Sequence, residues 1–503
     1  MNEKPPESVS LFNSAFAIMQ REIFIHVLNI LTGVVVARTL GPEMLGIWVL
    51  LSLVSAYAEG FGRLKTDVSS IYILGSRKAR PEEILFSTTF FALISSLIIV
   101  AFLLWQFDYI ERLLLSSTDV HYNQELMFIV LLIPFEFLLT NLSYFFIALE
   151  NVTTYNRIKV LQSILNFILI ILLTILLDLT LWALVIARIF STFIPLAYAW
   201  LSLEREGWIA LRNRWNKSIT MEILRYAFNF YVIGIIATVN RLTIKSIAAV
   251  SFNSSQLAFY NQAEAGSRLI NVIPNSISVI LYPRISKLEK KESAVEISCL
   301  SFRVTLLVLI GIGTLLFLMA NPLIVFLYGI EFEPTAEVLK IAIPGVVIGS
   351  SCLSFKSFFE GSGKADIIPK LQIVPVVLQI IFSYFLIDAL GLIGAAIAFS
   401  LGSALYGIVI FIAFIFYINL KYFKNYSVIF IQQYSDKFEY NLSRIEITNL
   451  NYIDEKEILT YFDYFIDKSI FLVPIKETTY FIFFLMIRRP PRSTLFPYTT
   501  LFR

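Results

Sequence analysis

Residues Val34–Leu50 read VVVARTLGPEMLGIWVL, two apolar segments separated by the pair Gly41-Pro42. Proline lacks the N–H that helix continuation needs, and glycine tolerates the backbone angles of a tight turn. The pair therefore predicts the end of one helix and the immediate start of another. Because both flanking segments are apolar, the stretch is typical of a hairpin between two membrane-spanning helices.

The whole chain has the composition of an integral membrane protein. Its 503 residues are 57% hydrophobic and 15% charged, and its mean hydropathy is +0.75. A soluble core of any size needs fewer apolar residues than this. No cleavable signal sequence is expected, so the first apolar segment is interpreted as a retained span. The two cysteines, Cys299 and Cys352, offer neither a disulfide framework nor a metal cluster.

The last residues of the chain are interpreted separately from the rest. Residues 486–503, MIRRPPRSTLFPYTTLFR, back-translate without mismatch into a common sequencing adapter. Residues 483–485 fit the T-rich nucleotide run that precedes this adapter. We therefore expect 483–503 to be a sequencing artefact and the native C-terminus to be unknown. Without the four arginines of this segment, 36 basic residues face 37 acidic ones, and the nominal charge of +3 becomes −1. Net charge consequently indicates no class of partner.

Twelve apolar segments are long enough to cross a bilayer, whose hydrocarbon core requires about 20 residues of helix. They lie at 14–38, 44–63, 84–106, 126–148, 158–177, 180–202, 221–242, 256–282, 300–320, 338–360, 367–388 and 391–419. The sequence thus predicts an all-α integral membrane fold.

The two halves of the chain repeat one pattern. An offset of 210 residues places Pro134 on Pro344 and Glu150 on Glu360, and offsets of 211 and 212 align other spans. Chance similarity among apolar helices is the alternative, but it does not account for matched charged residues. Because six helices return the chain to the same side, the repeat predicts two six-helix bundles in the same orientation. We expect bundles at 1–203 and 204–420, followed by a polar cytosolic tail of unknown role at 421–482.

The distribution of Lys and Arg among short loops predicts the orientation in the membrane. With the N-terminus inside, the cytoplasmic loops hold seventeen basic residues and the opposite loops hold four. We therefore expect a multi-pass protein of the bacterial plasma (inner) membrane with both termini cytoplasmic.

Polar side chains follow one face of the first, second, seventh and eighth spans. An offset of 212 carries Glu59 and Arg63 of the second span onto Asn271 and Asn275 of the eighth, so the same face is polar in both halves. A charge at mid-membrane costs about 2.5 to 3.5 kcal/mol on insertion scales, so such faces must meet protein or water. A wet central cleft between the bundles explains the shared pattern. Helix–helix contact is the alternative, and we favour it for the isolated residues Glu136 and Arg188.

The side chains of this predicted cleft suit phosphate and sugar. Arginine donates two hydrogen bonds to phosphate oxygens and stays charged, while amides and hydroxyls suit sugar hydroxyls. The candidate substrate-binding residues are Arg21, Arg63, Arg225, Asn229, Arg268, Asn271 and Asn275. The candidate residues for ion or proton coupling are Glu22, His26, Glu59 and Glu264. For His26, whose charge can change near neutral pH, a hydrogen-bonded core histidine is the alternative.

Three other basic residues lie near the predicted outer ends of spans. They are Arg38, Arg241 and Lys245. Long basic side chains at such places often reach to the membrane surface, so we interpret them as interfacial anchors.

The first hairpin also carries a motif. Residues 37–46 follow the pattern Ala-Arg-x-Leu-Gly-Pro-x-x-x-Gly, with Arg38, Gly41, Pro42 and Gly46 in place. The pattern resembles the polysaccharide-export or lipid-linked oligosaccharide (O-antigen type) flippase family of the multidrug/oligosaccharidyl-lipid/polysaccharide exporter superfamily. This resemblance implies two bundles of six helices with spans one, two, seven and eight around the cavity. The chain departs from the family after Arg241, where relatives often carry an acidic residue and this sequence has Leu242-Thr243.

These observations favour a flippase that moves a lipid-pyrophosphate-linked oligosaccharide, the repeat unit of a surface polysaccharide such as O-antigen, to the outer leaflet by alternating access. Its expected partners are the lipid-linked oligosaccharide, the lipid bilayer and glycan polymerase or ligase machinery, without nucleic acid. The alternatives are a multidrug or metabolite cation antiporter of the same superfamily and a peptidoglycan-precursor flippase. We expect no enzyme activity, cofactor or metal, because no catalytic constellation, nucleotide loop or metal-ligand spacing is present.

Overall fold

The computed structural model describes residues 7–75, 80–115, 122–177, 180–208, 215–286, 288 and 291–435. Throughout these residues the regular elements are helices, with no strand. The first half contains α1 Glu7–Tyr57, η1 Ala58–Gly62, α2 Thr66–Gly75, α3 Pro81–Trp105, α4 Phe107–Leu115, α5 Asn123–Ala148, α6 Val152–Ile171, η2 Leu172–Leu176 and α7 Leu181–Arg205. The second half contains α8 Lys217–Ser251, α9 Ser254–Ser267, η3 Arg268–Asn271, α10 Val272–Ser286, α11 Lys291–Tyr328, η4 Ile330–Phe332, α12 Glu333–Ser351, α13 Leu353–Gly361 and α14 Ile367–Ser435.

The helices account for the twelve predicted spans. Among the described residues, nine helical stretches are long and apolar enough to cross a bilayer, and two of them hold two spans each. α1 is broken at Gly41, with φ 75° and ψ 177°, and α14 is broken at Gly391, with φ 57° and ψ −129°. Glycine adopts positive φ without steric cost, so the chain turns at these positions. The eighth predicted span is divided into α9, the 3₁₀ segment η3 and α10.

Among the described residues, those up to Ile415 form one compact unit. Helix α14 continues through the tail boundary expected at residue 420 and ends at Ser435. The remainder of the expected tail, 436–482, and the segment 483–503 lie outside the described residues.

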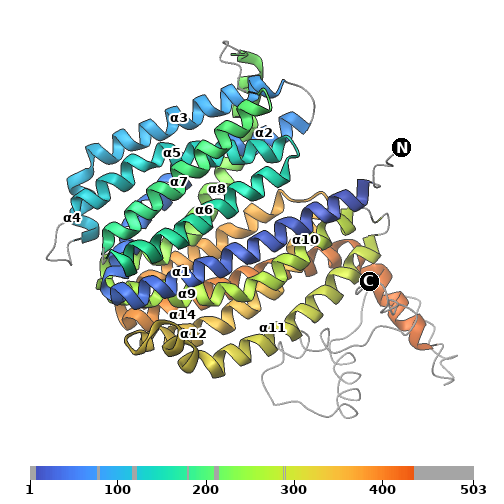
Figure 1. The fold of residues 1–503 in the computed structure, drawn as a ribbon. Coiled ribbons are helices and arrows are strands. Elements are labelled where there is room, and N and C mark those ends of the chain that lie inside the picture. The colour runs from blue at the N-terminus through green and yellow to red at the C-terminus, as the bar shows by residue number, and fades with distance from the viewer. Residues whose placement is uncertain are drawn as a thin grey trace. The chain divides into compact units, whose positions relative to one another are not determined.

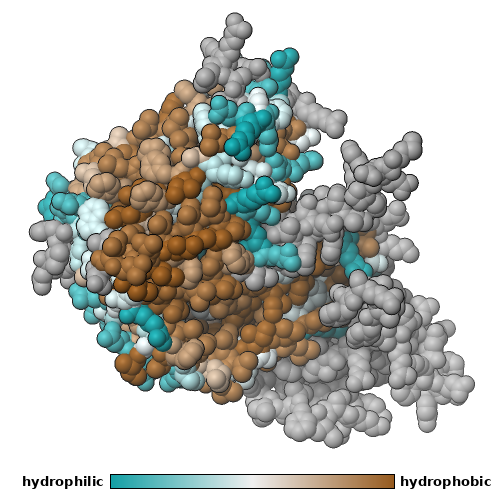
Figure 2. Space-filling view, in the orientation of Figure 1, coloured by the Kyte–Doolittle hydropathy of each residue, from teal (hydrophilic) through white to brown (hydrophobic). Residues whose placement is uncertain are grey.

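The outer surface of the spans is apolar, as a bilayer requires. Large hydrophobic side chains such as Leu97 and Ile98 on α3, and Leu307 and Leu318 on α11, are exposed. Figure 2 shows a broad hydrophobic area over one face of the molecule, with hydrophilic residues gathered toward its margins. Contiguous exposed apolar surface of this kind is unfavourable in water and favourable against lipid. The protein is therefore a multi-pass membrane protein.

Each half packs its own helices together, and a few helices join the halves. In the first half α5 contacts α3 and α7, while α6 contacts α7 and α1; in the second half α12 contacts α11 and α9, and α10 contacts α13. Between the halves, α1 contacts α9 and α2 contacts α8. Figure 1 shows α1 and α9 running beside each other.

Helix α9 begins where its sequence provides a cap. Asn253 Oδ1 accepts a hydrogen bond from the backbone N–H of Gln256 at 2.8 Å, and the Gln256 side chain accepts one from the Asn253 N–H at 3.2 Å. This reciprocal capping box satisfies donors that the first turn of a helix leaves unpaired. It fixes the start of α9 beside α1.

The two halves approach most closely at glycines. A Cβ atom added at Gly46 of α1 would lie 1.7 Å from the carbonyl oxygen of Ser254, and one added at Gly60 of η1 would lie 2.2 Å from the Thr238 side chain of α8. Real Cβ atoms essentially never come within 3.0 Å of another heavy atom in this way. Backbone therefore lies directly against backbone at Gly46, which is the last residue of the sequence motif in the first hairpin.

We predict that Gly46→Ala lowers the free energy of unfolding of the purified protein by about 2 kcal/mol or more, since overpacking costs about 1 to 3 kcal/mol and a backbone neighbour cannot rotate away. Denaturation in mixed micelles measures this change. Gly311→Ala on α11 is the matched control, because a Cβ there meets nothing within 4 Å. Equal stability of the two variants would contradict the close contact.

Candidate functional site

Six charged residues form a cluster within the first half, here named the N-half cluster. It consists of Arg21, Glu22, Glu59, Arg63, Asp67 and Lys159. Arg21 on α1 is buried, pairs with Glu22, and donates from Nη1 to Asn156 Oδ1 at 3.1 Å. Its guanidinium also lies 4.6 Å from the ring centre of Tyr155 on α6. These contacts attach the start of the first span to α6.

Arg63 is the central residue of the N-half cluster. Its Nη1 lies 2.8 Å from Glu59 Oε1, and its Nη2 lies 3.0 Å from Asp67 Oδ2. The guanidinium lies 5.5 Å from the ring centre of Tyr144 on α5. Since the π segment η1 ends at Gly62 and α2 begins at Thr66, Arg63 occupies a break in the helix. The break places one arginine between two carboxylates.

Lys159 of α6 completes the N-half cluster. It interacts electrostatically with Glu59, Arg63, Arg21 and Glu22. The six members comprise three cationic and three anionic side chains, and Lys65 beside them also interacts electrostatically with Glu59 and Asp67.

A second cluster lies within the second half, here named the C-half cluster. It consists of Lys245, Asn261, Glu264 and Arg268. Glu264 of α9 accepts Arg268 Nη2 at 2.5 Å on Oε1 and Lys245 Nζ at 2.9 Å on Oε2, and Lys245 also donates to Asn261 Oδ1 at 2.7 Å. The Glu264 side chain is 4% exposed, whereas that of Arg268 is 45% exposed. One buried carboxylate thus holds two cations, and the side chain of one of them, Arg268, is partly exposed.

The other predicted site residues are distributed as follows. Asn271 accepts a hydrogen bond from Ser350 of α12, so it joins two helices of the second half. His26, Arg225 and Asn275 are exposed. The side chain of Asn229 lies outside the described residues.

The structure brings the predicted site residues together in two groups. Arg21, Glu22, Glu59 and Arg63 meet in the first half, and Glu264 and Arg268 meet in the second. Among the described side chains, no ion pair joins one cluster to the other. The single continuous cleft with all eleven predicted residues on its walls stays a prediction.

The second and seventh predicted spans are in direct contact, and we name this contact the α8 seam. Tyr231 of α8 donates to the carbonyl oxygen of Phe61 at 2.7 Å, and the Tyr72 and Tyr226 rings lie 4.4 Å apart. Tyr57 and Ser246 share a further hydrogen bond. Along this line the two halves are packed against each other.

The interpretation of Lys245 as an interfacial anchor needs correction. Lys245 is paired with buried Glu264, because α9 passes beside the end of α8. Arg38 is exposed and donates at 2.8 Å to the carbonyl of Leu327 and also to that of Phe326, so it joins α1 to the end of α11. Its interpretation as an anchor stays a prediction.

The isolated polar pair behaves as the helix-contact interpretation predicted. Arg188 Nε of α7 donates to Glu136 Oε1 of α5 at 2.7 Å, and the same guanidinium lies 5.9 Å from the Trp48 ring centre. This pair joins three helices of the first half and belongs to neither cluster.

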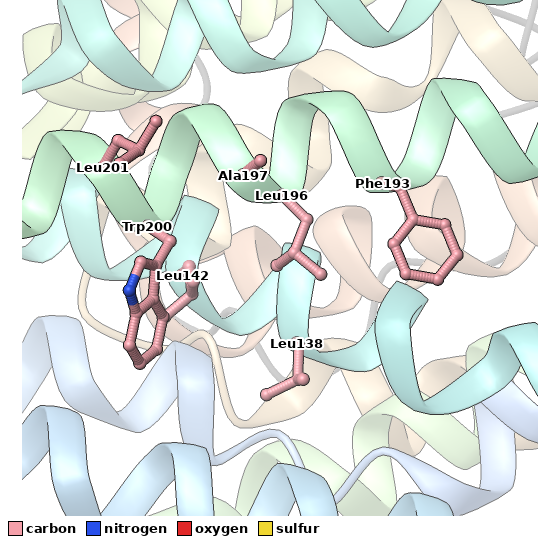
Figure 3. A pocket seen from close by; sticks show the side chains of 7 residues that line it. All are labelled: Leu138, Leu142, Phe193, Leu196, Ala197, Trp200 and Leu201. Carbon is pink, nitrogen blue, oxygen red and sulfur yellow. The ribbon is translucent and has the colours of Figure 1, made fainter.

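A groove on the first half is apolar and separate from both clusters. It lies between α5 and α7, with a volume of about 420 Å³. Figure 3 shows its lining, which consists of Leu138, Leu142, Phe193, Leu196, Ala197, Trp200 and Leu201. Its apolar lining suits hydrocarbon.

Sequence reasoning missed four members of the clusters: Asp67, Lys159, Lys245 and Asn261. Asp67 is four residues after Arg63, a spacing that pairs side chains on a helix and could have identified it. Lys159 and Lys245 reach their partners only through the packing of α6 on α1 and of α9 on α8.

The sequence profile of a family described as polysaccharide biosynthesis protein matches residues 35–337, more than half of the chain. The chain belongs to this family. Comparison with curated protein sequences gave no match. The matched region contains the Gly41-Pro42 turn, the whole C-half cluster, and the N-half cluster except Arg21 and Glu22.

Solved structures with the same fold are transporters and flippases. The chain is 16% identical to the lipid II flippase MurJ in an inward closed conformation, with 84% of this chain and 93% of MurJ covered and a TM-score of 0.65. It is 19% identical to an inward-facing MATE multidrug transporter of the MOP superfamily, with 79% and 95% covered and a TM-score of 0.64. It is 17% identical to a MOP superfamily transporter from Pyrococcus furiosus, with 83% of this chain and 99% of that chain covered and a TM-score of 0.59. The chain therefore has the fold of this superfamily.

We predict that Glu264→Gln lowers the free energy of unfolding by about 3 to 5 kcal/mol, because it leaves the Lys245 and Arg268 charges without their carboxylate. Denaturation in mixed micelles measures the change. Asp366→Asn is the matched control, since its pair with Lys370 is exposed at 3.4 Å and should be worth less than about 1 kcal/mol. Similar losses in both variants would contradict a structural role for the buried carboxylate.

Proposed function

We propose that this protein is a flippase that moves a lipid-pyrophosphate-linked oligosaccharide, the repeat unit of a surface polysaccharide such as O-antigen or another lipopolysaccharide component, from the cytoplasmic to the outer leaflet. The proposal places it in the bacterial inner membrane with both termini in the cytoplasm. Alternating access between its two halves performs the transfer. The family match and the fold shared with a lipid II flippase support the class of transporter.

The observation that carries the proposal is the exposed guanidinium of Arg268, held in place by a buried carboxylate. Arg268 lies at η3, inside the eighth predicted span, and its side chain is 45% exposed. An exposed charge at such a place is costly against lipid, so it faces a polar phase. Arg225 and Arg241 of α8 are also exposed. A surface with excess positive charge suits a diphosphate, whose oxygens accept the paired donors of arginine.

Two carboxylates of the N-half cluster are exposed as well, but each is already paired. Glu22 and Glu59 are 51% and 52% exposed and pair with Arg21 and Arg63. An exporter of cationic drugs would need such carboxylates for its substrate. Because these carboxylates are exposed, a cation antiporter of the same superfamily is the second candidate. The chain is almost equally similar to MATE and to MurJ, so structural similarity does not distinguish the two candidates.

Deleting the gene from its host should leave the lipid-linked oligosaccharide on the cytoplasmic leaflet and deplete the surface glycan. A leaflet-specific labelling assay measures the first effect and glycan staining the second. Residues 1–482 should restore both. Unchanged glycan with altered drug tolerance would instead assign the protein to the antiporters.

We predict that Arg268→Ala and Arg225→Ala each reduce transport by about thirtyfold, since losing a charged hydrogen bond to the substrate diphosphate costs about 2 kcal/mol. Arg205→Ala at the exposed end of α7 is the matched control and should transport normally. Protein amounts in the membrane are compared by immunoblot. Normal surface glycan in both test variants would overturn the assignment of the phosphate site.

A further inference from the structure

Asp67 is a buried carboxylate with incomplete pairing. It lies in the first turn of α2, and its side chain is 3% exposed. Apart from the Arg63 guanidinium at 3.0 Å, neither of its oxygens has a hydrogen-bond partner of good geometry. Buried carboxylates usually accept several hydrogen bonds, because an under-paired charge in a medium of low polarity is unfavourable. Binding a proton removes that charge.

The arginine that pairs with Asp67 has a second partner at the surface. Arg63 contacts Glu59, which is 52% exposed, while its own side chain is 11% exposed and its Nε has no hydrogen-bond partner. The guanidinium thus lies between a buried carboxylate and an exposed one. Loss of the buried charge would leave Glu59 as its only paired carboxylate.

The triad formed by Glu59, Arg63 and Asp67 has no charged counterpart in the second half. An offset of 212 places its members on Asn271, Asn275 and Val279. Asn275 and Val279 lie within helix α10, directly after η3. The charged triad is therefore specific to the first half.

We propose that Asp67 binds the proton that couples transport, and that Arg63 carries the effect of this proton to the substrate phosphate. The inference rests on the proposed flippase function and deepens it. When Asp67 binds one proton on its carboxylate, Arg63 is released from it and donates to a phosphate oxygen. When Arg63 returns to Asp67, that proton leaves to water, so one proton is exchanged per cycle.

The charged and titratable groups near Asp67 are few. Lys65 and Tyr144 interact with it electrostatically, and Glu59 acts through the shared Arg63. Helix α2 also packs against α3 and α8, but no described charged group of those two helices pairs with Asp67. Of the two carboxylates paired with Arg63, Asp67 is shielded from water and Glu59 is about half exposed.

The first experiment measures proton binding without any substrate. Infrared difference spectra of the full-length protein in nanodiscs, recorded between high and low pH, should contain the C=O band of a buried carboxylic acid. Asp67→Asn should remove this band, and Asp67→Glu should restore a shifted one. Asp366 is an exposed aspartate between α13 and α14, so Asp366→Asn is the matched control and should keep the band. Retention of the band in Asp67→Asn would overturn the proposal.

The second experiment measures binding of geranylgeranyl diphosphate as a probe of the phosphate site. At pH 8, Asp67→Asn should bind the diphosphate about tenfold more tightly than the wild type does, and at pH 5 the two affinities should be equal. The sign follows because protonated Asp67, like asparagine, carries no charge and frees Arg63 for an anionic ligand. Because the ligand titrates identically for both proteins, the ratio of the two affinities at each pH isolates Asp67.

The outcomes separate the two proposals. A carboxylic-acid band that depends on Asp67, without binding of the diphosphate, would contradict the flippase assignment and leave the proton site standing. Diphosphate binding with the same pH dependence in wild type and Asp67→Asn would overturn the proton site and leave the flippase assignment standing. Affinity that follows sodium concentration at constant pH, with no carboxylic-acid band, would also overturn it.

Discussion

The cost of placing charge in a medium of low polarity determines how this structure is organised. Every strongly buried charge in the two clusters has an opposite charge against it, as with Glu264 between two cations and Asp67 beside Arg63. Such pairs are costly to desolvate and costlier to break. They therefore fix the relative positions of α8 and α9 and of the helix break after η1. The apolar helices could pack in several registers, but the ion pairs permit few of them.

The duplicated architecture has diverged in charge more than in form. Both halves break the second helix of their bundle near its middle, one with a π segment and the other with a 3₁₀ segment. The N-half cluster has three cations and three carboxylates, whereas the C-half cluster has two cations and one carboxylate. In the function we propose, the two halves have different roles: the second half attracts the phosphate, and the first half exchanges the proton.

Hydropathy and glycine–proline pairs were sufficient to predict the helical membrane fold and most span limits. The break at Gly41 was predictable because it depends on residues adjacent in sequence. The irregular segments η1 and η3 were not, because they depend on packing between residues distant in sequence: Gly60 of η1 lies against Thr238 of α8, and η3 contacts α11 and α12. The polar stripes correctly grouped Arg63 with Glu59 and Arg268 with Glu264. Lys245 and Lys159 could not be assigned, since their partners lie on other helices.

The contact of Gly46 with Ser254 has a consequence for how such a protein can evolve. Because the tightest junction between the halves is made by backbone atoms, it places no demand on the side chains that line the rest of the interface. One glycine must be kept, and the surrounding positions can exchange charged residues for amides without separating the bundles. A fold joined in this way can acquire a different cargo through a small number of substitutions, and its scaffold stays the same.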